Sequence, residues 1–378
     1  MTHRERLVAA LSHEQPDMVP IDLGGTADSS IVVEGYERLK AHFGIEAENT
    51  LCDRMMRIVE VDERILQALD IDTRAVFLGT PRETPPDPGP QKYRDVWGVE
   101  RIKLDDSFYY DQVQFPLAGD ISTADIVKYP WPDPDDPGLV EGLRERVAWI
   151  REQTDCAAIL RIPAPFVHLS QYLRGFEDWF CDLIVNPTLL ETLFDAILAR
   201  TMRIAERVLR EVGQEVDAVI CGDDLGTQKG LQMRYEQYEK YIKPRHATYF
   251  RQAHDLSPAK FVFHTCGSVA NILDDLIEIG VDVLNPVQVS AAGMDPLVFK
   301  QKYGGRLAFW GAMDTQYVLP HGSVADVKKM VEERIEQMGE GGGYVLAAVH
   351  NLQPDVPLEN ILAMFRHARE YVPSFMKA

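Results

Sequence analysis

The stretch that decides the fold is residues 261–285, FVFHTCGSVANILDDLIEIGVDVLN. It begins with Phe261–His264, an apolar run of strand length, and continues into Val269–Ile279, which has the apolar periodicity of a helix. A second apolar run, Val281–Asn285, follows directly. A strand, a helix and another strand in this order predict a parallel β–α–β unit.

The same alternation extends over most of the chain. Apolar runs with β-branched residues occur at Met18–Asp22, Ala75–Leu78, Ala157–Ile162, Asp217–Cys221, Phe261–His264, Val281–Asn285, Leu307–Trp310 and Tyr344–Val349. Helical patterns occur at Pro187–Glu211, Val269–Ile279, Asp295–Tyr303 and Val324–Met338. Eight such units predict an α/β fold, a (β/α)8 TIM barrel. The alternative is an open doubly wound sheet, but no GxGxxG motif follows any strand.

One segment interrupts this pattern. Two proline-rich stretches, Thr80–Pro90 and Tyr129–Pro137, flank Lys92–Phe115, which is rich in Tyr, Val and Phe. This middle piece is too short for a domain and predicts an inserted β-hairpin. We therefore expect a single barrel domain over residues 1–378, with a helical N-terminal segment and an insertion at about 80–137.

Composition excludes several classes of protein. The 378 residues are 46% hydrophobic, and 39 Lys+Arg against 59 Asp+Glu give a net charge of −20. This is an ordinary globular composition, and its acidity disfavours nucleic acid or an anionic membrane as a partner. No apolar window is long enough to span a membrane, and the N-terminus lacks a signal peptide's apolar region. We expect a soluble, cytoplasmic protein.

Polar residues gather where the predicted strands end, which is where barrels place their functional groups. The strongest signal is His264-x-Cys266, since residues i and i+2 of an extended chain project to one side and can share an ion. His350 ends the last strand on the same rim. Three N/S ligands with an open fourth position are typical of catalytic zinc. The alternatives are a buried, inert Cys266 and a hydrogen-bonded rim His350.

Other strand ends supply further candidates. Asp223 and Asp224 are candidate catalytic residues, as general acid or base, as a fourth ligand or as groups that orient a ligand. The alternative is that they are solvated and cap the loop that follows. Arg161 is a candidate for binding a substrate carboxylate or for pairing with one of these aspartates. The other candidate substrate-binding residues are His168, Asn285 and Trp310.

Several stretches together resemble the uroporphyrinogen decarboxylase superfamily. They are Thr2-His-Arg-Glu-Arg-Leu-Val-Ala-Ala-Leu11, Pro16-Asp-Met-Val-Pro20, Leu173-Arg-Gly-Phe-Glu177 before Asn186-Pro187, Asp223-Asp-Leu-Gly-Thr-Gln228, His264-Thr-Cys-Gly267 and Pro357-Leu-Glu-Asn-Ile-Leu-Ala-Met364. The resemblance implies a (β/α)8 barrel. It also implies one of two activities: cofactor-free porphyrinogen decarboxylation, or zinc-dependent methyl transfer with a corrinoid protein.

The motifs favour the methyltransferase branch. Where the decarboxylases have an arginine-bearing segment, this chain has Asp22-Leu-Gly-Gly-Thr26. The methyltransferases use His-x-Cys and a later Cys in a Gly-Cys-Gly stretch, and at that place this chain has Val349-His350-Asn351. The resemblance therefore implies zinc held by His264 and Cys266, with His350 replacing the third ligand, a cysteine.

Replacing a thiolate with a neutral imidazole makes the ligand set less negative, so the zinc becomes a stronger Lewis acid. The leading hypothesis is a methyltransferase for O-demethylation, which moves a methyl group from a methoxylated, aromatic substrate to the Co(I) corrinoid (cobalamin) of a partner protein. Alternatives are a methylcorrinoid:thiol methyltransferase, a metal-free uroporphyrinogen-type decarboxylase and a non-catalytic corrinoid-binding or scaffold protein. A homodimer is also left open.

Overall fold

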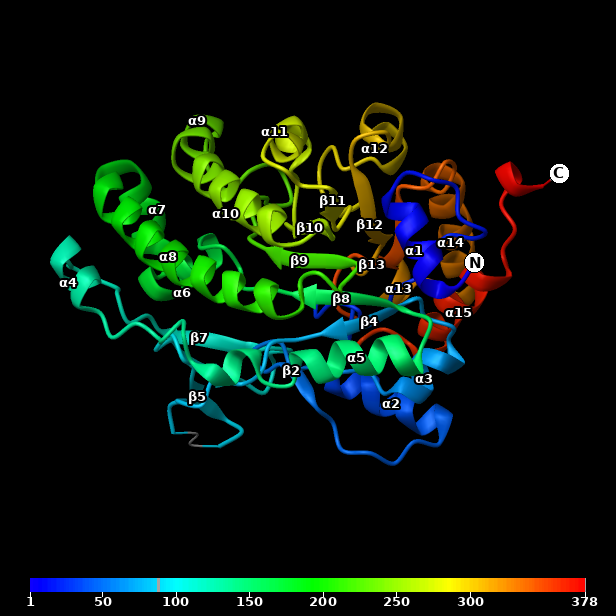
Figure 1. Cartoon of the computed structure of the whole chain (residues 1–378), viewed down its shortest axis with the longest axis horizontal. Coiled ribbons are helices and arrows are strands. Elements are labelled where there is room, and N and C mark those ends of the chain that lie inside the picture. The colour runs from blue at the N-terminus through cyan, green and yellow to red at the C-terminus, as the bar shows by residue number, and fades with distance from the viewer. Residues whose placement is uncertain (87–88, 378) are drawn as a thin grey trace.

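Seven parallel strands form the central sheet (Figure 1). The structure is a computed structural model that describes residues 1–86 and 89–377. Neighbouring strands pair in the order β13-β12-β11-β10-β9-β8-β4, which follows the chain in reverse. Seven of the eight predicted strands are thus confirmed. Their bounds are β4 (Thr73–Val76), β8 (Ala157–Arg161), β9 (Ala218–Gly222), β10 (Lys260–His264), β11 (Val283–Asn285), β12 (Ala308–Met313) and β13 (Tyr344–Ala348).

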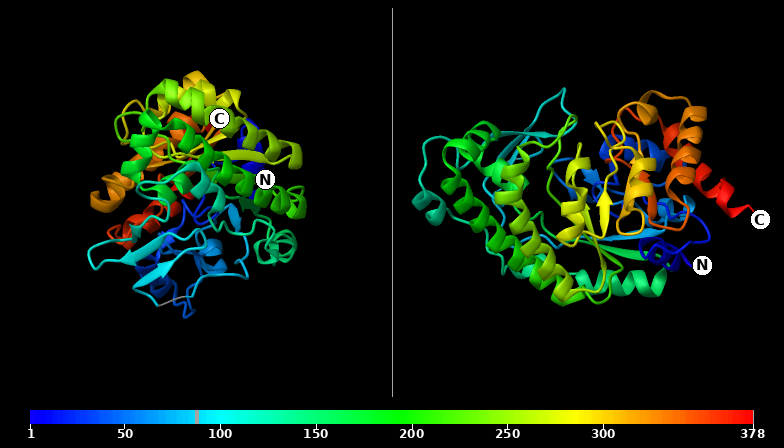
Figure 2. Two further views of the ribbon diagram at one scale, coloured as in Figure 1. Left: turned by 90° about the vertical axis from the view of Figure 1, so that its left-hand side faces the viewer. Right: turned by 90° about the horizontal axis from the view of Figure 1, so that it is seen from above.

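Helices follow these strands and cover the outer face of the sheet (Figures 1 and 2). All four predicted helices are confirmed, and the one at 269–279 is a 3-10 turn, η3 (Ala270–Ile272), joined to α11 (Leu273–Glu278). Local sequence sets their starts, because the Ser323 side chain caps α14 and Asp295 caps α12. The main outer helices are α5 (Leu143–Gln153), α8 (Pro187–Val212), α10 (Lys243–Leu256), α11, α12 (Pro296–Tyr303), α14 (Val324–Met338) and α15 (Leu358–Glu370).

The predicted first strand, Met18–Asp22, is wrong as a strand. Only Ile21 pairs, through a single parallel bridge to Leu346 of β13. On the other side its carbonyl accepts a hydrogen bond from the Asp72 N–H, just before β4, at 3.1 Å. Pro20 has no N–H to donate, so a regular ladder cannot extend here. The described sheet is a curled sheet of seven strands whose two edges meet this bridging segment, in place of the predicted eight-stranded barrel.

The predicted hairpin at 92–115 has three strands instead of two. β5 (Lys92–Arg94), β6 (Glu100–Lys103) and β7 (Tyr110–Gln114) form an antiparallel sheet of their own. A second small sheet, which the sequence did not predict, joins β1 (Ile31–Val32), β3 (Ile58–Val59) and β2 (Leu51–Asp53). The remaining described helices are α2 (Val33–Phe43), α3 (Glu63–Ala68), α4 (Thr123–Lys128), η1 (Pro137–Val140), α6 (Val167–Arg174), α7 (Phe176–Val185), α9 (Tyr235–Gln237), η2 (Tyr238–Ile242), α13 (Val318–His321) and η4 (Ser374–Met376).

An apolar core fills the inside of the curled sheet. The predicted N-terminal helix is confirmed as α1 (His3–Leu11), and its Leu7 and Leu11 join alternate residues of six strands in one buried cluster. The strand members are Ala157, Ile159, Ala218, Ile220, Val262, Val283, Ala308, Trp310, Val345 and Ala347. Side chains alternate between the two faces of a strand, so the next inward positions toward the carboxyl ends are residues 161, 222, 264 and 285.

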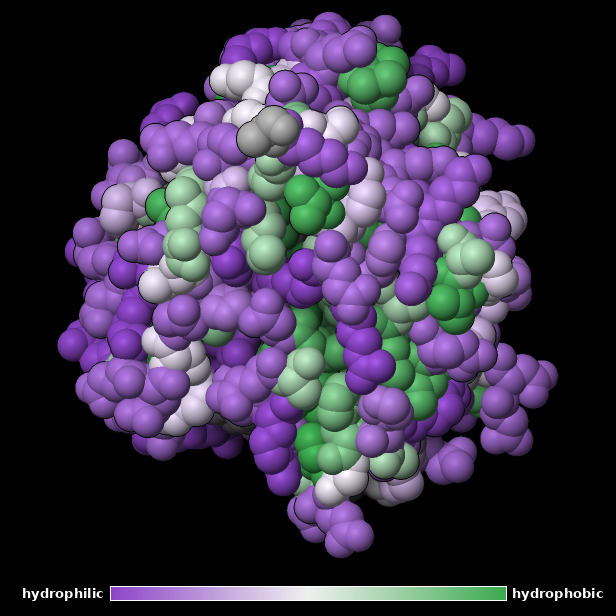
Figure 3. Space-filling model, turned by 90° about the vertical axis from the view of Figure 1, so that its right-hand side faces the viewer, coloured by the Kyte–Doolittle hydropathy of each residue, from purple (hydrophilic) through white to green (hydrophobic). Residues whose placement is uncertain are grey.

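The side of the molecule that lies on the right in Figure 1 is largely hydrophilic, with hydrophobic side chains exposed in a hollow of its lower half (Figure 3). Within the part of the chain that the structure describes, no helix combines the length and the apolarity needed to cross a bilayer.

A buried ion cluster fixes the amino end of the sheet. The fully buried Asp72 accepts hydrogen bonds from the Ile21 N–H at 2.7 Å, from Arg6 of α1 at 2.6 Å and from Arg369 of α15 at 2.5 Å. It also binds Nδ1 of His3 at 2.8 Å. One carboxylate therefore joins the bridging segment, the first helix and the last helix.

We predict that Asp72→Asn lowers the free energy of unfolding by about 3–5 kcal/mol, because it leaves two arginines without their buried carboxylate. Denaturant titration measures this change. The matched control is Asp70→Asn, which alters an exposed partner of Arg369 and should cost less than about 1 kcal/mol. Equal losses in both variants would contradict the role given to Asp72.

The same carboxylate predicts a pH dependence of stability. Burial opposes its charge, but His3, Arg369 and Arg6 together hold the pKa of Asp72 below its usual range. The stability that the Asp72 carboxylate contributes is thus complete above the pKa of Asp in the unfolded chain, about 3.9. It is lost as the pH falls from there through the lower pKa that Asp72 has in the folded protein. Between neutral pH and pH 3, wild type should lose more stability than Asp72→Asn, as measured by denaturation at each pH.

Candidate metal centre

Three nitrogen and sulfur ligands converge at the carboxyl ends of β10 and β13. One ligand atom each from His264, Cys266 and His350 lies within 4.8 Å of the other two. His264 is the last residue of β10 and is buried, while Cys266 and His350 are partly buried. Nε2 of His264 lies 3.4 Å from Sγ of Cys266. The sequence named all three residues, and the structure brings them together.

Each histidine ring is held by an amide. Nδ1 of His264 lies 2.6 Å from Oδ1 of Asn285, and Nδ1 of His350 lies 2.8 Å from Oδ1 of Asn351. Each asparagine oxygen can only accept, so it pairs with the Nδ1–H form of the ring. In that form Nε2 carries no proton and can bind a cation. Asn285, named as a possible pocket wall, therefore contacts a proposed ligand directly.

Glycines let the β9 and β10 loops approach closely enough to build the centre. A Cβ at residue 222 would lie 2.7 Å from the Cβ of His264, so only glycine leaves room for this ring. Gly267 has a φ of +87°, and a Cβ there would lie 2.4 Å from the carbonyl carbon of Gly226. The two loops thus pack backbone against backbone, and Cys266 is held between them.

Asp224 orders the loop that carries Cys266. Its Oδ1 accepts the Cys266 N–H at 2.7 Å and lies 3.9 Å from Nε2 of His264. Its Oδ2 lies 3.3 Å from Nε2 of His168. Burial opposes charge on both groups, but their attraction raises the pKa of His168 to about 9 and holds the pKa of Asp224 well below its usual range. They form an ion pair beside the three ligands at neutral pH.

Asp223 has different contacts from its neighbour. It is fully buried and accepts the backbone N–H groups of Phe166, Val167 and His168, each at 3.0 Å. It also lies 3.1 Å from Nε2 of His246 on α10. These donors include the first turn of α6, so this carboxylate caps a helix from another strand. Asp223 thus caps α6, an earlier element of the chain, whereas the capping alternative concerned the loop that follows its own strand.

Two other predicted site residues lie inside the curled sheet. Trp310 is fully buried in the apolar core, and its indole N–H donates to Asp22 at 2.9 Å. Arg161 occupies the inward position at the end of β8. Burial acts to lower its pKa, but the negative charges of Asp28 and Asp53 outweigh burial, so the pKa is raised. The structure does not bring Trp310 to the three ligands.

Four further residues lie at the centre that were not among the predicted site residues. Oδ2 of Asp28, in the loop after Gly24 and Gly25, lies 3.6 Å from Nδ1 of His264. Tyr109, from the insertion, donates to Oδ1 of Asn351 at 2.8 Å, and Gln353 donates to the same oxygen at 2.6 Å. Asn351 and Gln353 belong to a polar strand end that the sequence did signal. Asp28 and Tyr109 lie outside the strand pattern, which gave no sign of them.

The donor set fits zinc. Two imidazole nitrogens and one sulfur are ligands that Zn²⁺ prefers, and three protein ligands leave a fourth position for a substrate. Burial, then Asp224 and Asp28, raise the pKa of the Cys266 thiol, so a bound cation is what would favour its thiolate.

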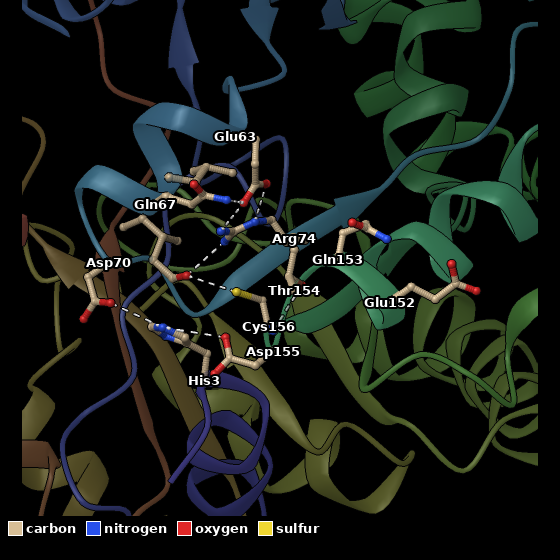
Figure 4. Close-up of a pocket in the computed structure, with 12 residues that line it drawn as sticks. His3, Glu63, Gln67, Asp70, Arg74, Glu152, Gln153, Thr154, Asp155 and Cys156 are labelled. Atoms are coloured by element: carbon tan, nitrogen blue, oxygen red, sulfur yellow. Dashed lines mark hydrogen bonds and ion pairs between the residues drawn. The ribbon is translucent and has the colours of Figure 1, made fainter.

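A polar cavity of about 480 Å³ lies at the opposite, amino-terminal rim (Figure 4). His3 lies 3.3 Å from Asp70 there, and Arg74 lies 2.7 Å from Glu63. Cys156 also lines it, and burial raises the pKa of this thiol to about 11. Groups at this end of a barrel serve stability, and these ion pairs have that character.

Comparison with known proteins gives one family. A family model described as uroporphyrinogen decarboxylase (URO-D) matches residues 116–371. No curated protein sequence matches the chain. Among solved structures, the chain is similar to a methyltransferase from Methanosarcina mazei, with 18% identity, a TM-score of 0.66, and coverage of 98% of this chain and 99% of that one.

Two xylanases also match, at lower similarity. A GH10 endoxylanase from a sugarcane soil metagenome has 8% identity and a TM-score of 0.39, covering 63% of this chain and 85% of its own. Xylanase 10B from Thermotoga maritima has 11% identity and a TM-score of 0.36, covering 60% and 78%. Scores this low support no comparison of function.

We predict that Gly222→Ala weakens zinc binding about tenfold or more, because the new methyl group displaces His264. Competition with a chromophoric chelator measures the affinity. Gly230→Ala is the control, since a Cβ there meets no atom within 4 Å. If Gly222→Ala bound zinc as tightly as the control, His264 would not be the ligand that this packing holds.

Proposed function

Because the chain belongs to the uroporphyrinogen decarboxylase family, we propose that it is a zinc-dependent methyltransferase of that family. The proposed reaction moves a methyl group from a methoxylated, aromatic substrate to the Co(I) corrinoid of a partner protein. The observation that carries this proposal is the convergence of His264, Cys266 and His350 at the carboxyl ends of the strands. The Methanosarcina mazei structure, itself described as a methyltransferase, supports the choice of branch.

The charge of the ligand set supports an ether as methyl donor. Two neutral imidazoles and one thiolate carry one negative charge in total, one less than a set with two thiolates. When bound, zinc would supply a Lewis acid for the ether oxygen, whose negative charge grows as the methyl group leaves. A thiol-activating site would instead benefit from the more negative ligand set.

The chain's own residues would prepare this site. Asn285 and Asn351 fix the tautomer and angle of the two rings, and Asp224 fixes the backbone of Cys266. In the transfer the methyl–oxygen bond breaks, its electron pair stays on the oxygen, and the cobalt supplies the pair that forms the new bond. His168, whose pKa Asp224 raises to about 9, would be charged at neutral pH and is our candidate to protonate the departing oxygen.

A second candidate is a methylcorrinoid:thiol methyltransferase. The His264-x-Cys266 pair supports it, because the resemblance to the family's zinc methyltransferases gives the same first two ligands for either methyl acceptor. The two candidates differ in the methyl acceptor. Incubation with methylcobalamin and a thiol should give a thioether only under the second.

We predict that the protein purified without added metal contains about one zinc per chain, and that His264→Ala, Cys266→Ala and His350→Ala each lose it. Elemental analysis measures the content. The matched control is Cys181→Ala, which removes an exposed free cysteine and should keep the metal. A full zinc content in His264→Ala and Cys266→Ala would leave the proposal without its central observation.

Restoring a second thiolate tests the choice of donor. His350→Cys should keep zinc but lower ether demethylation by about tenfold, because the ligand set gains a negative charge. The rate of methylcorrinoid formation with a corrinoid protein measures this effect. A variant that demethylates ethers as fast as wild type would contradict the charge argument while leaving the metal site intact.

A further inference from the structure

A cavity of about 740 Å³ lies between the insertion and the carboxyl ends of β4 and β8. Leu78 follows β4, Trp97 and Trp131 come from the insertion, and Arg161 and Pro163 lie at the end of β8. Its volume is in the range of pockets that enclose small organic ligands. None of the roles proposed above accounts for it.

The walls of this cavity suit an aromatic ring. The rings of Trp97 and Trp131 meet edge to face, with centroids 6.3 Å apart. Leu169 of α6 and Ile204 of α8 add aliphatic surface. Aromatic and aliphatic side chains that line a cavity bind a planar, apolar body through its buried area and through edge-to-face contacts.

Arg161 supplies a positive charge to the same cavity. Over residues 1–86 and 89–377 its guanidinium makes no hydrogen bond and no ion pair, and Asp28 and Asp53 act on it only at longer range. By contrast, Arg82, near the rim of the cavity, is paired with Glu141 at 3.2 Å. Asp28 and Asp53 stabilise this charge from a distance, but no acceptor among the described residues lies at hydrogen-bond distance from the guanidinium, and an oxyanion of a ligand would supply that contact.

The inner end of the cavity lies beside the metal centre. Arg161 occupies the last inward position of β8, where the register pairs it with Ile220, one inward position before the row of Gly222, His264 and Asn285. Asp28 connects the two places, since it interacts with Arg161 and lies 3.6 Å from Nδ1 of His264. An anionic oxygen on Arg161 would therefore sit at the boundary between the cavity and the three ligands.

We propose that this cavity binds the aromatic ring of the substrate and that Arg161 pairs with an anionic oxygen on that ring. The substrate class is then a methoxylated aromatic oxyanion, with the anionic group next to the methoxy group. The methoxy group rests on the proposed function, whereas the preference for an anion rests on Arg161 and the cavity alone.

Equilibrium binding, followed by tryptophan fluorescence and by calorimetry, tests this proposal without turnover. The probes are ortho-methoxybenzoate, ortho-methoxyphenol and the neutral ortho-methoxytoluene. Wild type should bind the benzoate at least about tenfold more tightly than the toluene. Arg161→Met should remove this preference, Arg161→Lys should keep part of it, and the control Arg82→Gln should keep all of it.

Several results would overturn the proposal: equal binding of the benzoate, the phenol and the toluene, a preference for the anion retained in Arg161→Met, or no binding of any probe. Stronger binding of the phenol than of the toluene supports a phenolate, and binding of the benzoate alone supports a carboxylate. Demethylation of neutral methoxyarenes with no preference for anions would contradict this inference, while the proposed function would still stand. Binding of the anionic probes with no methyl transfer from any ether would contradict the proposed function, while the anion preference of this cavity would still stand.

Discussion

One row of paired residues holds the candidate site together. In the parallel register, His264 stands opposite Gly222 of β9 on one side and Asn285 of β11 on the other. The glycine leaves space for the imidazole, and the asparagine carbonyl fixes its Nδ1. A shift of register by one residue would turn the His264 ring to the outer face of the sheet, away from the metal centre. The orientation of the first ligand is thus a property of the sheet itself.

The other ligands depend on that row through the backbone. Gly226 and Gly267 bring the β9 and β10 loops into contact, and Asp224 on one loop accepts the N–H of Cys266 on the other. His350 lies two residues after β13, the strand at the far edge of the sheet, and reaches the centre because the sheet curls. The buried Asp72 and the bridge at Ile21 join its two edges, so the ion cluster at the amino end also supports the geometry at the carboxyl end.

The sequence predicted the parts of this structure that depend on local pattern. Seven strands and the four helices between them follow from runs and periodicities of four or more residues, and the three ligands follow from polar residues at strand ends. Met18–Asp22 failed because the same apolar composition surrounds Pro20, which has no N–H for a ladder. The hairpin failed at its third strand, because Tyr110–Gln114 carries alternating polar residues that a loop also carries.

What the sequence could not supply was contact between distant segments. Asp223 and Asp224 are adjacent and chemically identical, yet one caps α6 and the other contacts Cys266, and only the fold separates them. Asp28 and Tyr109 reach the centre from a loop and from the insertion, whose paths no periodicity determines. Trp310 was a candidate substrate-binding residue, but the strand alternation that points its side chain inward also buries it in the core.

The central claim is that His264, Cys266 and His350 together bind zinc. Zinc K-edge X-ray absorption on the protein as purified tests it most directly, because the method reports ligand types and distances around the metal. The account predicts one sulfur at about 2.3 Å and two imidazole nitrogens at about 2.0–2.1 Å, with one further light atom. A shell with no sulfur, or with two or more sulfurs, would contradict it.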